Sequence, residues 1–178
     1  MRTPLFTIAC LAISTAGLIA QESTATPIAD DIRKAWDGAK HYVQASAEVM
    51  PEENYGFKPV DTVRTFGAII AHVAGANYVF CSAAKGEQSP HAEDEFEKTA
   101  KTRAEIQKAL EGSIAYCDAA YSVDDKTLGQ VVDLPFGMGK GSRARLLLLN
   151  TGHNLEHYGN LVTYLRMKGV VPPSSRGQ

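Results

Sequence analysis

Apolar residues recur every three or four positions over long parts of the chain, the period of a helix that is buried along one side. The first such segment predicts a helix over residues 27–50, with Thr26 as N-cap, Pro27 at the first helical position and Pro51 as its end. Its apolar positions form a single stripe: Ile32, Trp36, Ala39, Val43 and Ala47. Few segments alternate in the manner of strands, so the pattern favours an all-α domain.

Three further segments have the same helical period. We expect helices over residues 65–85, 96–121 and 142–168, the first of them ended by Gly86 and the last by Gly169. Between the last two, a glycine-rich stretch follows Val131 and Val132 and is compatible with a short hairpin. Four long helices in one chain predict a four-helix bundle.

The N-terminal segment has a different character. Residues 1–20, MRTPLFTIACLAISTAGLIA, carry one charged side chain, Arg2, before a mostly apolar run that ends at Ala20. The run is too short and too polar for a membrane span and predicts a signal peptide over residues 1–20. We therefore expect an exported protein, periplasmic or extracellular, with a mature domain over residues 27–175 and no membrane contact after cleavage.

Composition and charge narrow the function classes. The 178 residues are 44% hydrophobic and 21% charged, which disfavours disorder and a polytopic membrane protein. The 18 basic side chains are balanced by 20 acidic ones, so we expect no nucleic-acid partner. The sequence also lacks GxGxxG, Walker, HExxH and GxSxG motifs.

The informative constellation is TGHNLEHYGN, in which His153 and His157 are four residues apart in the last predicted helix. Side chains at this spacing lie one turn apart on one face, so both imidazoles can reach one point. That face is expected to point into the core, where a divalent metal ion would satisfy the imidazole nitrogens. His72, in the middle of the second helix, is the candidate third ligand. The alternative is that His72 packs at a helix interface and binds a carbonyl group.

The remaining candidates are less specific. His41 and His91 are interpreted as surface residues, whereas Asn150, Glu156 and Asn160 are the polar residues nearest the histidine pair by helical geometry. After signal cleavage Cys81 and Cys117 remain, either as one disulfide or as two small buried residues. Leu148, Leu155 and Val162 form a second apolar stripe on the last helix, indicating a homodimer contact or burial beneath the connections.

Three stretches, MPEENYGFKP, VRTFGAIIAHVAGAN and HNLEHYGNLVTYLRMKGVVPPSS, resemble the DinB-like (DinB/YfiT-like) family over residues 28–175. The resemblance implies a four-helix bundle with a crossover between the second and third helices, which then run parallel. It also implies a divalent metal held by His72, His153 and His157. Cys81 and Cys117 would then lie at the same end of the bundle, where a disulfide can form.

Three neutral nitrogen ligands leave coordination positions open, as in catalytic rather than structural zinc sites. We expect an enzyme in which Zn²⁺ or Ni²⁺ activates water or a substrate heteroatom, in the manner of a hydrolase acting on an unidentified small molecule. One alternative is an exported metal-binding or stress-related bundle without turnover. A second is the thiol S-transferase-like activity that some relatives suggest, and a third is a bundle whose histidines make ordinary hydrogen bonds.

Overall fold

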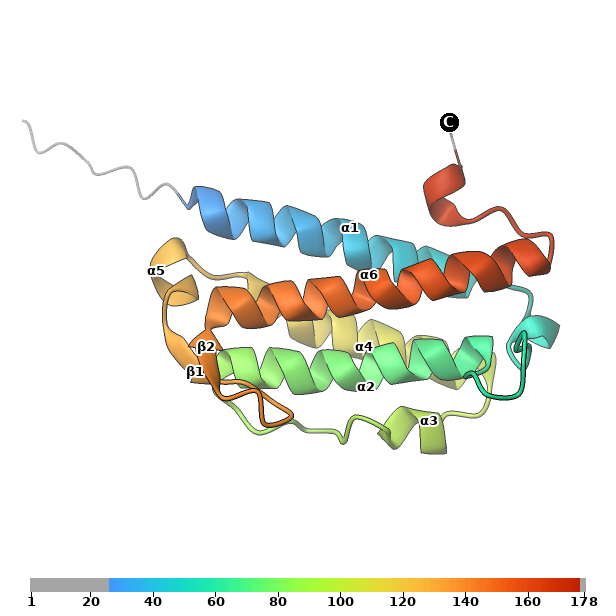
Figure 1. Ribbon diagram of the computed structural model, residues 1–178, viewed down its shortest axis with the longest axis horizontal. Coiled ribbons are helices and arrows are strands. Elements are labelled where there is room, and N and C mark those ends of the chain that lie inside the picture. Colours follow the sequence, from blue (N-terminus) through green and yellow to red (C-terminus); the bar gives the residue numbers. More distant parts are fainter. Residues whose placement is uncertain (1–25, 177–178) are drawn as a thin grey trace, which may run out of the picture.

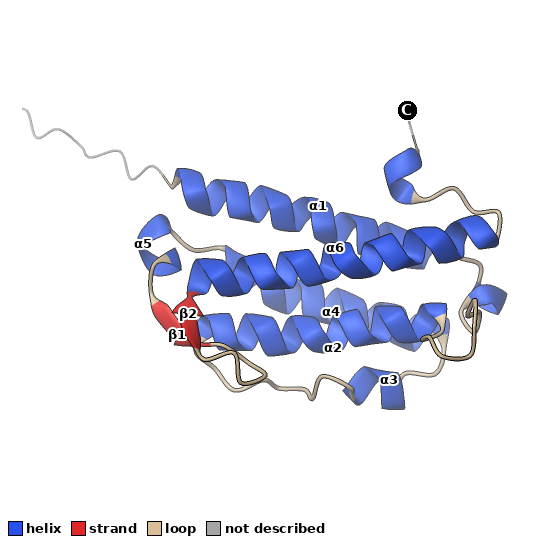
Figure 2. Cartoon of the chain, in the orientation of Figure 1, coloured by secondary structure: helices blue, strands red, loops and turns tan. Residues whose placement is uncertain are grey.

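The structure is a computed structural model that describes residues 26–176. Four long helices lie side by side: α1 (Pro27–Val49), α2 (Phe66–Lys85), α4 (Arg103–Tyr121) and α6 (Arg143–Met167). Short elements join them: η1 (Glu52–Asn54), α3 (Glu95–Thr99), α5 (Asp125–Leu128), the strands β1 (Val131–Asp133) and β2 (Lys140–Ser142), and η2 (Pro173–Ser175). The four-helix bundle predicted from the sequence is confirmed. Figure 2 shows that β-strands make up only a small part of the described chain. The signal peptide predicted over residues 1–20 lies outside the described residues.

Helix α2 is the most buried of the four long helices. Thr65 caps its N-terminus by accepting a hydrogen bond from the backbone N–H of Ala68, and Gly86 ends it in a left-handed conformation. Among the described residues, α2 is also the one helix long and apolar enough to cross a membrane, but 78% of that apolar window is buried in the bundle. Such burial is typical of the core helix of a folded domain.

Helices α2 and α4 run in the same direction. Near their N-terminal ends, a Cβ atom placed on Gly67 would lie 3.0 Å from the Cδ1 atom of Ile106. Near their C-terminal ends, Cys81 and Cys117 form a disulfide with Cα atoms 5.3 Å apart. The chain between the two helices therefore returns along the length of the bundle, and α3 lies on this connection (Figure 1).

The third predicted helix, over residues 96–121, is wrong at its N-terminal end. The chain forms α3, becomes extended at Ala100 and starts α4 only at Arg103. Thr102 and Glu105 form a capping box, in which each side chain binds the backbone N–H of the other residue. This box makes a new helix start more favourable than continuation of α3.

The connection before α3 packs directly onto α2 at Gly75. A Cβ atom on Gly75 would overlap the backbone carbonyl of Glu93. The absence of a side chain at this position lets the extended segment lie close against the helix. As a result, α3 is held against the N-terminal half of α2, next to His72 (Figure 1).

Strands β1 and β2 pair antiparallel with Val131 opposite Ser142, as the glycine-rich stretch predicts.

The second apolar stripe of α6 is partly uncovered. Leu148 is 51% exposed and Leu155 is 44% exposed, whereas Val162 is partly buried against the core. The connections therefore leave Leu148 and Leu155 uncovered, and the homodimer contact stays a prediction.

Candidate metal centre

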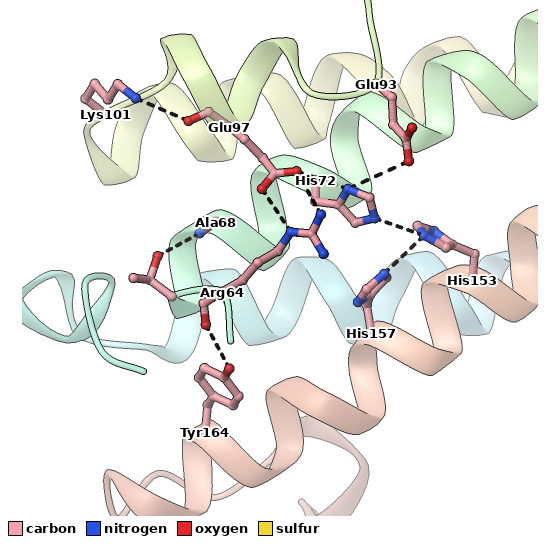
Figure 3. A network of polar contacts seen from close by, with 10 residues as sticks. Arg64, Ala68, His72, Glu93, Glu97, Lys101, His153, His157 and Tyr164 are labelled. Atoms are coloured by element: carbon pink, nitrogen blue, oxygen red, sulfur yellow. Dashed lines mark hydrogen bonds and ion pairs between the residues drawn. The ribbon is translucent and has the colours of Figure 1, made fainter. Parts of the chain in front are cut away.

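Three imidazole rings from two helices meet inside the bundle. His72 lies in the middle of α2, and His153 and His157 lie one turn apart on α6. The Nε2 atom of His153 is 3.2 Å from Nε2 of His72 and 3.1 Å from Nε2 of His157. Ligand-capable nitrogen atoms of all three residues lie within 4.8 Å of one another. Figure 3 shows the three rings turned toward a common point.

These distances fit a single first-row divalent ion. Metal–nitrogen bonds of 2.0–2.1 Å at angles between octahedral and tetrahedral place the ligand nitrogens about 2.8–3.4 Å apart. The two measured separations, 3.2 and 3.1 Å, fall within that interval. The ligand nitrogens of His72 and His157 lie within 4.8 Å of each other, so side-chain adjustment would close this third separation when all three bind one ion.

All three imidazoles are held in the neutral form. Burial lowers the pKa of His153 to about 3, helped by repulsion from His157, His72 and Arg64. Burial likewise lowers the pKa of His157 to about 4, and the pKa of His72 is lowered by burial and then by Arg64, against the opposing effect of Glu97. At neutral pH each ring therefore offers a lone pair rather than a positive charge.

Glu97 of α3 binds the far side of the His72 ring. Its Oε1 atom lies 3.2 Å from Nδ1 of His72, and a second carboxylate, that of Glu93, lies 4.0 Å from the same nitrogen. A neutral His72 that donates a hydrogen bond from Nδ1–H to Glu97 turns the Nε2 lone pair toward the other two rings. This carboxylate–histidine arrangement is common around metal ligands, where it orients the ring and raises its basicity.

The other two rings have no comparable support. The Nδ1 atoms of His153 and His157 are buried and have no hydrogen-bond partner within the described part of the chain. Each neutral ring carries one N–H proton. Three Nε2 atoms that face one another therefore cannot all find a hydrogen-bond partner among themselves. A cation at the common point would remove this mismatch, so the donor set fits a metal.

Arg64 fixes the carboxylate of Glu97 in turn. Its Nε atom donates to Oε2 of Glu97 at 2.9 Å and its Nη2 atom donates to Oε1 at 3.3 Å. The backbone carbonyl of Arg64 accepts a hydrogen bond from the hydroxyl of Tyr164 on α6, at 2.8 Å. Sequence patterns gave no indication of Arg64 or Glu97, because both lie outside the long helices: Arg64 reaches the site from the connection before α2, and Glu97 reaches it from the crossover between α2 and α4.

The other sequence candidates lie in several environments. Asn150 is buried away from the three rings, where its amide donates to the hydroxyl of Tyr121 at 3.2 Å and lies 3.6 Å from the Sγ atom of Cys81. Glu156, Asn160 and His41 are exposed. His91 is partly exposed: its ring packs against Tyr78, and its Nδ1 atom lies 2.9 Å from Oε1 of Glu95.

An open cavity of about 660 Å³ reaches the centre from the side of His157. Its lining comes from the segment before α2, from α2 itself and from α6: Pro59, Val60, Asp61, Thr62, Val63, Arg64, Ile69, His157, Asn160 and Tyr164. This volume is in the range of small-molecule sites. A ligand in the cavity would contact His157 and Arg64. Arg64 in turn holds Glu97 against His72.

Comparison with known families identifies the bundle. Residues 35–161, most of the chain, match the sequence model of the DinB superfamily. The chain belongs to the DinB superfamily. The family resemblance stated from the sequence is thereby confirmed. A curated relative in this superfamily, YjoA of Bacillus subtilis, is 25% identical over 125 residues, which are 69% of this chain and 79% of YjoA.

Solved structures of DinB-like proteins share the fold. A DinB-like protein of Bacillus cereus superposes with a TM-score of 0.65 at 17% identity, covering 81% of this chain and 95% of that one. YfiT of Bacillus subtilis, described as a probable metal-dependent hydrolase with an unusual four-helix bundle topology, gives a TM-score of 0.62 at 16% identity, covering 84% and 93%. At these identities the similarity establishes the common architecture.

Proposed function

We propose that this DinB superfamily protein is a metal-dependent enzyme of the hydrolase type, in which His72, His153 and His157 hold one divalent ion, Zn²⁺ or Ni²⁺. The observation that carries the proposal is the convergence of three neutral imidazole nitrogens at one point beside a cavity. YfiT, which has the same fold, is described in the same terms. Nitrogen ligands without a carboxylate suit zinc or nickel better than the iron of an oxygenase.

A divalent ion bound in this way supplies a Lewis acid and lowers the pKa of coordinated water toward neutrality. The chain's own groups orient the site around it. Glu97 accepts a hydrogen bond from Nδ1–H of His72 and so keeps the Nε2 lone pair directed inward. Arg64 holds Glu97 in place, and apolar cavity residues such as Val60 and Val63 would limit water around the bound substrate.

Export belongs to the same proposal. The apolar segment over residues 1–20 supports a signal peptide, and the Cys81–Cys117 disulfide suits an oxidising compartment such as the periplasm or the cell exterior. Such a compartment argues against a thiol S-transferase that depends on a cytosolic low-molecular-weight thiol. The principal alternative is therefore a metal-binding bundle without turnover.

The deciding experiment is an activity panel on metal-loaded protein. Ester, amide, phosphate and thiol substrates would be offered to the wild type, to His153→Ala and to His41→Ala, which changes an exposed histidine remote from the centre. Saturable hydrolysis that is lost in His153→Ala and kept in His41→Ala supports the enzyme. Full metal occupancy without turnover on any of these substrates supports the binding module instead.

A further inference from the structure

The guanidinium group of Arg64 has N–H donors left over after it has bound Glu97. Its Nε and Nη2 atoms bind Glu97, whereas Nη1 makes no hydrogen bond within the described residues. The side chain is 46% exposed and lines the cavity together with His157. In Figure 3 the free edge of the guanidinium points toward His72 and His157.

The charge of Arg64 lies next to the centre. The guanidinium binds the carboxylate of Glu97, which lies 3.2 Å from Nδ1 of His72, and it lines the same cavity as His157. The acidic residue on the cavity wall, Asp61, is exposed and paired with Lys58 at 2.9 Å. Glu97 balances the charge of Arg64, so a divalent ion would make the inner end of the cavity positive.

We infer that Arg64 forms an oxyanion subsite, so that the substrate carries a carboxylate or phosphate group while its reacting bond lies at the three histidines. This inference rests on the proposed function and specifies its substrate class. A guanidinium presents several N–H donors in one plane and binds carboxylate and phosphate oxygens with strong, charge-assisted hydrogen bonds. The substrate's anion would bind the Nη1 edge, next to the carboxylate that Arg64 already holds.

The competing role is purely supportive: Arg64 could act only by positioning Glu97 against His72. The two roles predict opposite effects of Glu97→Gln. If Arg64 only positions Glu97, removal of the Glu97 charge disturbs the site as removal of Arg64 does. If Arg64 binds the anion, Glu97→Gln frees the guanidinium, and anions bind equally well or more tightly.

The test measures small-ligand affinity for zinc-loaded protein by calorimetry. The probes are acetate, inorganic phosphate and imidazole, of which imidazole can bind the metal without carrying a negative charge. The variants are Arg64→Gln, Glu97→Gln and Arg166→Gln, the last removing an equal charge from α6 outside the cavity. Metal content is measured first on every protein.

We expect Arg64→Gln to weaken acetate or phosphate binding about tenfold or more, the loss typical of a hydrogen bond to a charged group. Imidazole affinity in Arg64→Gln and anion affinity in Arg166→Gln should stay within about twofold of the wild type. Tighter binding of acetate than phosphate in the wild type indicates a carboxylate substrate, and the reverse indicates a phosphate substrate.

The inference is overturned if zinc-loaded Arg64→Gln binds both anions as tightly as the wild type. It is also overturned if Glu97→Gln loses as much anion affinity as Arg64→Gln. If the wild type takes up neither zinc nor nickel, the proposed metal site itself fails and the inference fails with it, so the two failures are told apart by the metal content.

Discussion

The Nδ1 atom of His72 lies 3.2 Å from a carboxylate oxygen of Glu97, although the two residues are 25 positions apart and belong to different helices. The long connection between α2 and α4 makes this contact possible, because it carries α3 back along the bundle. Without that path, the ring of His72 would lack the partner that fixes its tautomer. The crossover is therefore part of the candidate metal centre as well as a feature of the topology.

Removal of this carboxylate should weaken metal binding. We expect Glu97→Ala to lower zinc affinity about 10- to 100-fold, the usual cost of losing a group that orients a metal ligand. Competition with a chromophoric chelator measures this change. Glu95→Ala is the matched control, since Glu95 lies on the same short helix but binds His91, outside the centre. Equal zinc affinity of Glu97→Ala and wild type would contradict the role assigned to Glu97.

A side chain at Gly75 should damage both stability and the site. Because its Cβ would overlap the carbonyl of Glu93, we expect Gly75→Ala to lower the free energy of unfolding by about 1–3 kcal/mol, as overpacking does. Displacement of the segment that carries Glu93 and Glu97 should also reduce zinc affinity. Urea denaturation and the chelator assay measure the two effects.

The control for this substitution is another helical glycine. A Cβ on Gly152 of α6 would meet nothing within 4 Å, so Gly152→Ala should leave stability unchanged or raise it by up to about 1 kcal/mol. If Gly75→Ala were as stable as Gly152→Ala, the close packing of the crossover on α2 would be refuted.

The sequence predicted those parts of the site that depend on local spacing. His153 and His157 follow from the four-residue repeat of α6, and His72 from its place in the middle of an apolar helix. Periodicity could not find Arg64 or Glu97, because each reaches the centre through tertiary packing of a connection. The T-x-x-E pattern at Thr102 was the available signal for the helix break and for a separate α3.

Asn150 illustrates a second limit of helical geometry. It shares a helix face with the histidine pair but lies nearer the start of α6, where its amide contacts Tyr121 and the disulfide. Angular position on a helix indicates which way a side chain points. Position along the axis decides which neighbours it meets, and the neighbours come from other helices.

The disulfide should stabilise the bundle without contributing to metal binding. Cys81 and Cys117 are 36 residues apart, and a crosslink of this span restricts the unfolded chain by about 3–4 kcal/mol in the loop-entropy description. We expect the double variant Cys81→Ala/Cys117→Ala to lose roughly that much stability in urea. Zinc affinity should change little under conditions where the variant is folded, since the cysteines do not belong to the histidine cluster. A large loss of zinc affinity in the folded variant would show that the centre depends on the crosslink.

The central claim is most directly tested by elemental analysis of metal in protein purified from its native compartment. We predict about one zinc or nickel ion per chain, lost when His72, His153 or His157 is changed singly to Ala and kept in His41→Ala. Wild-type protein without a divalent metal, or full occupancy in His72→Ala, would contradict it.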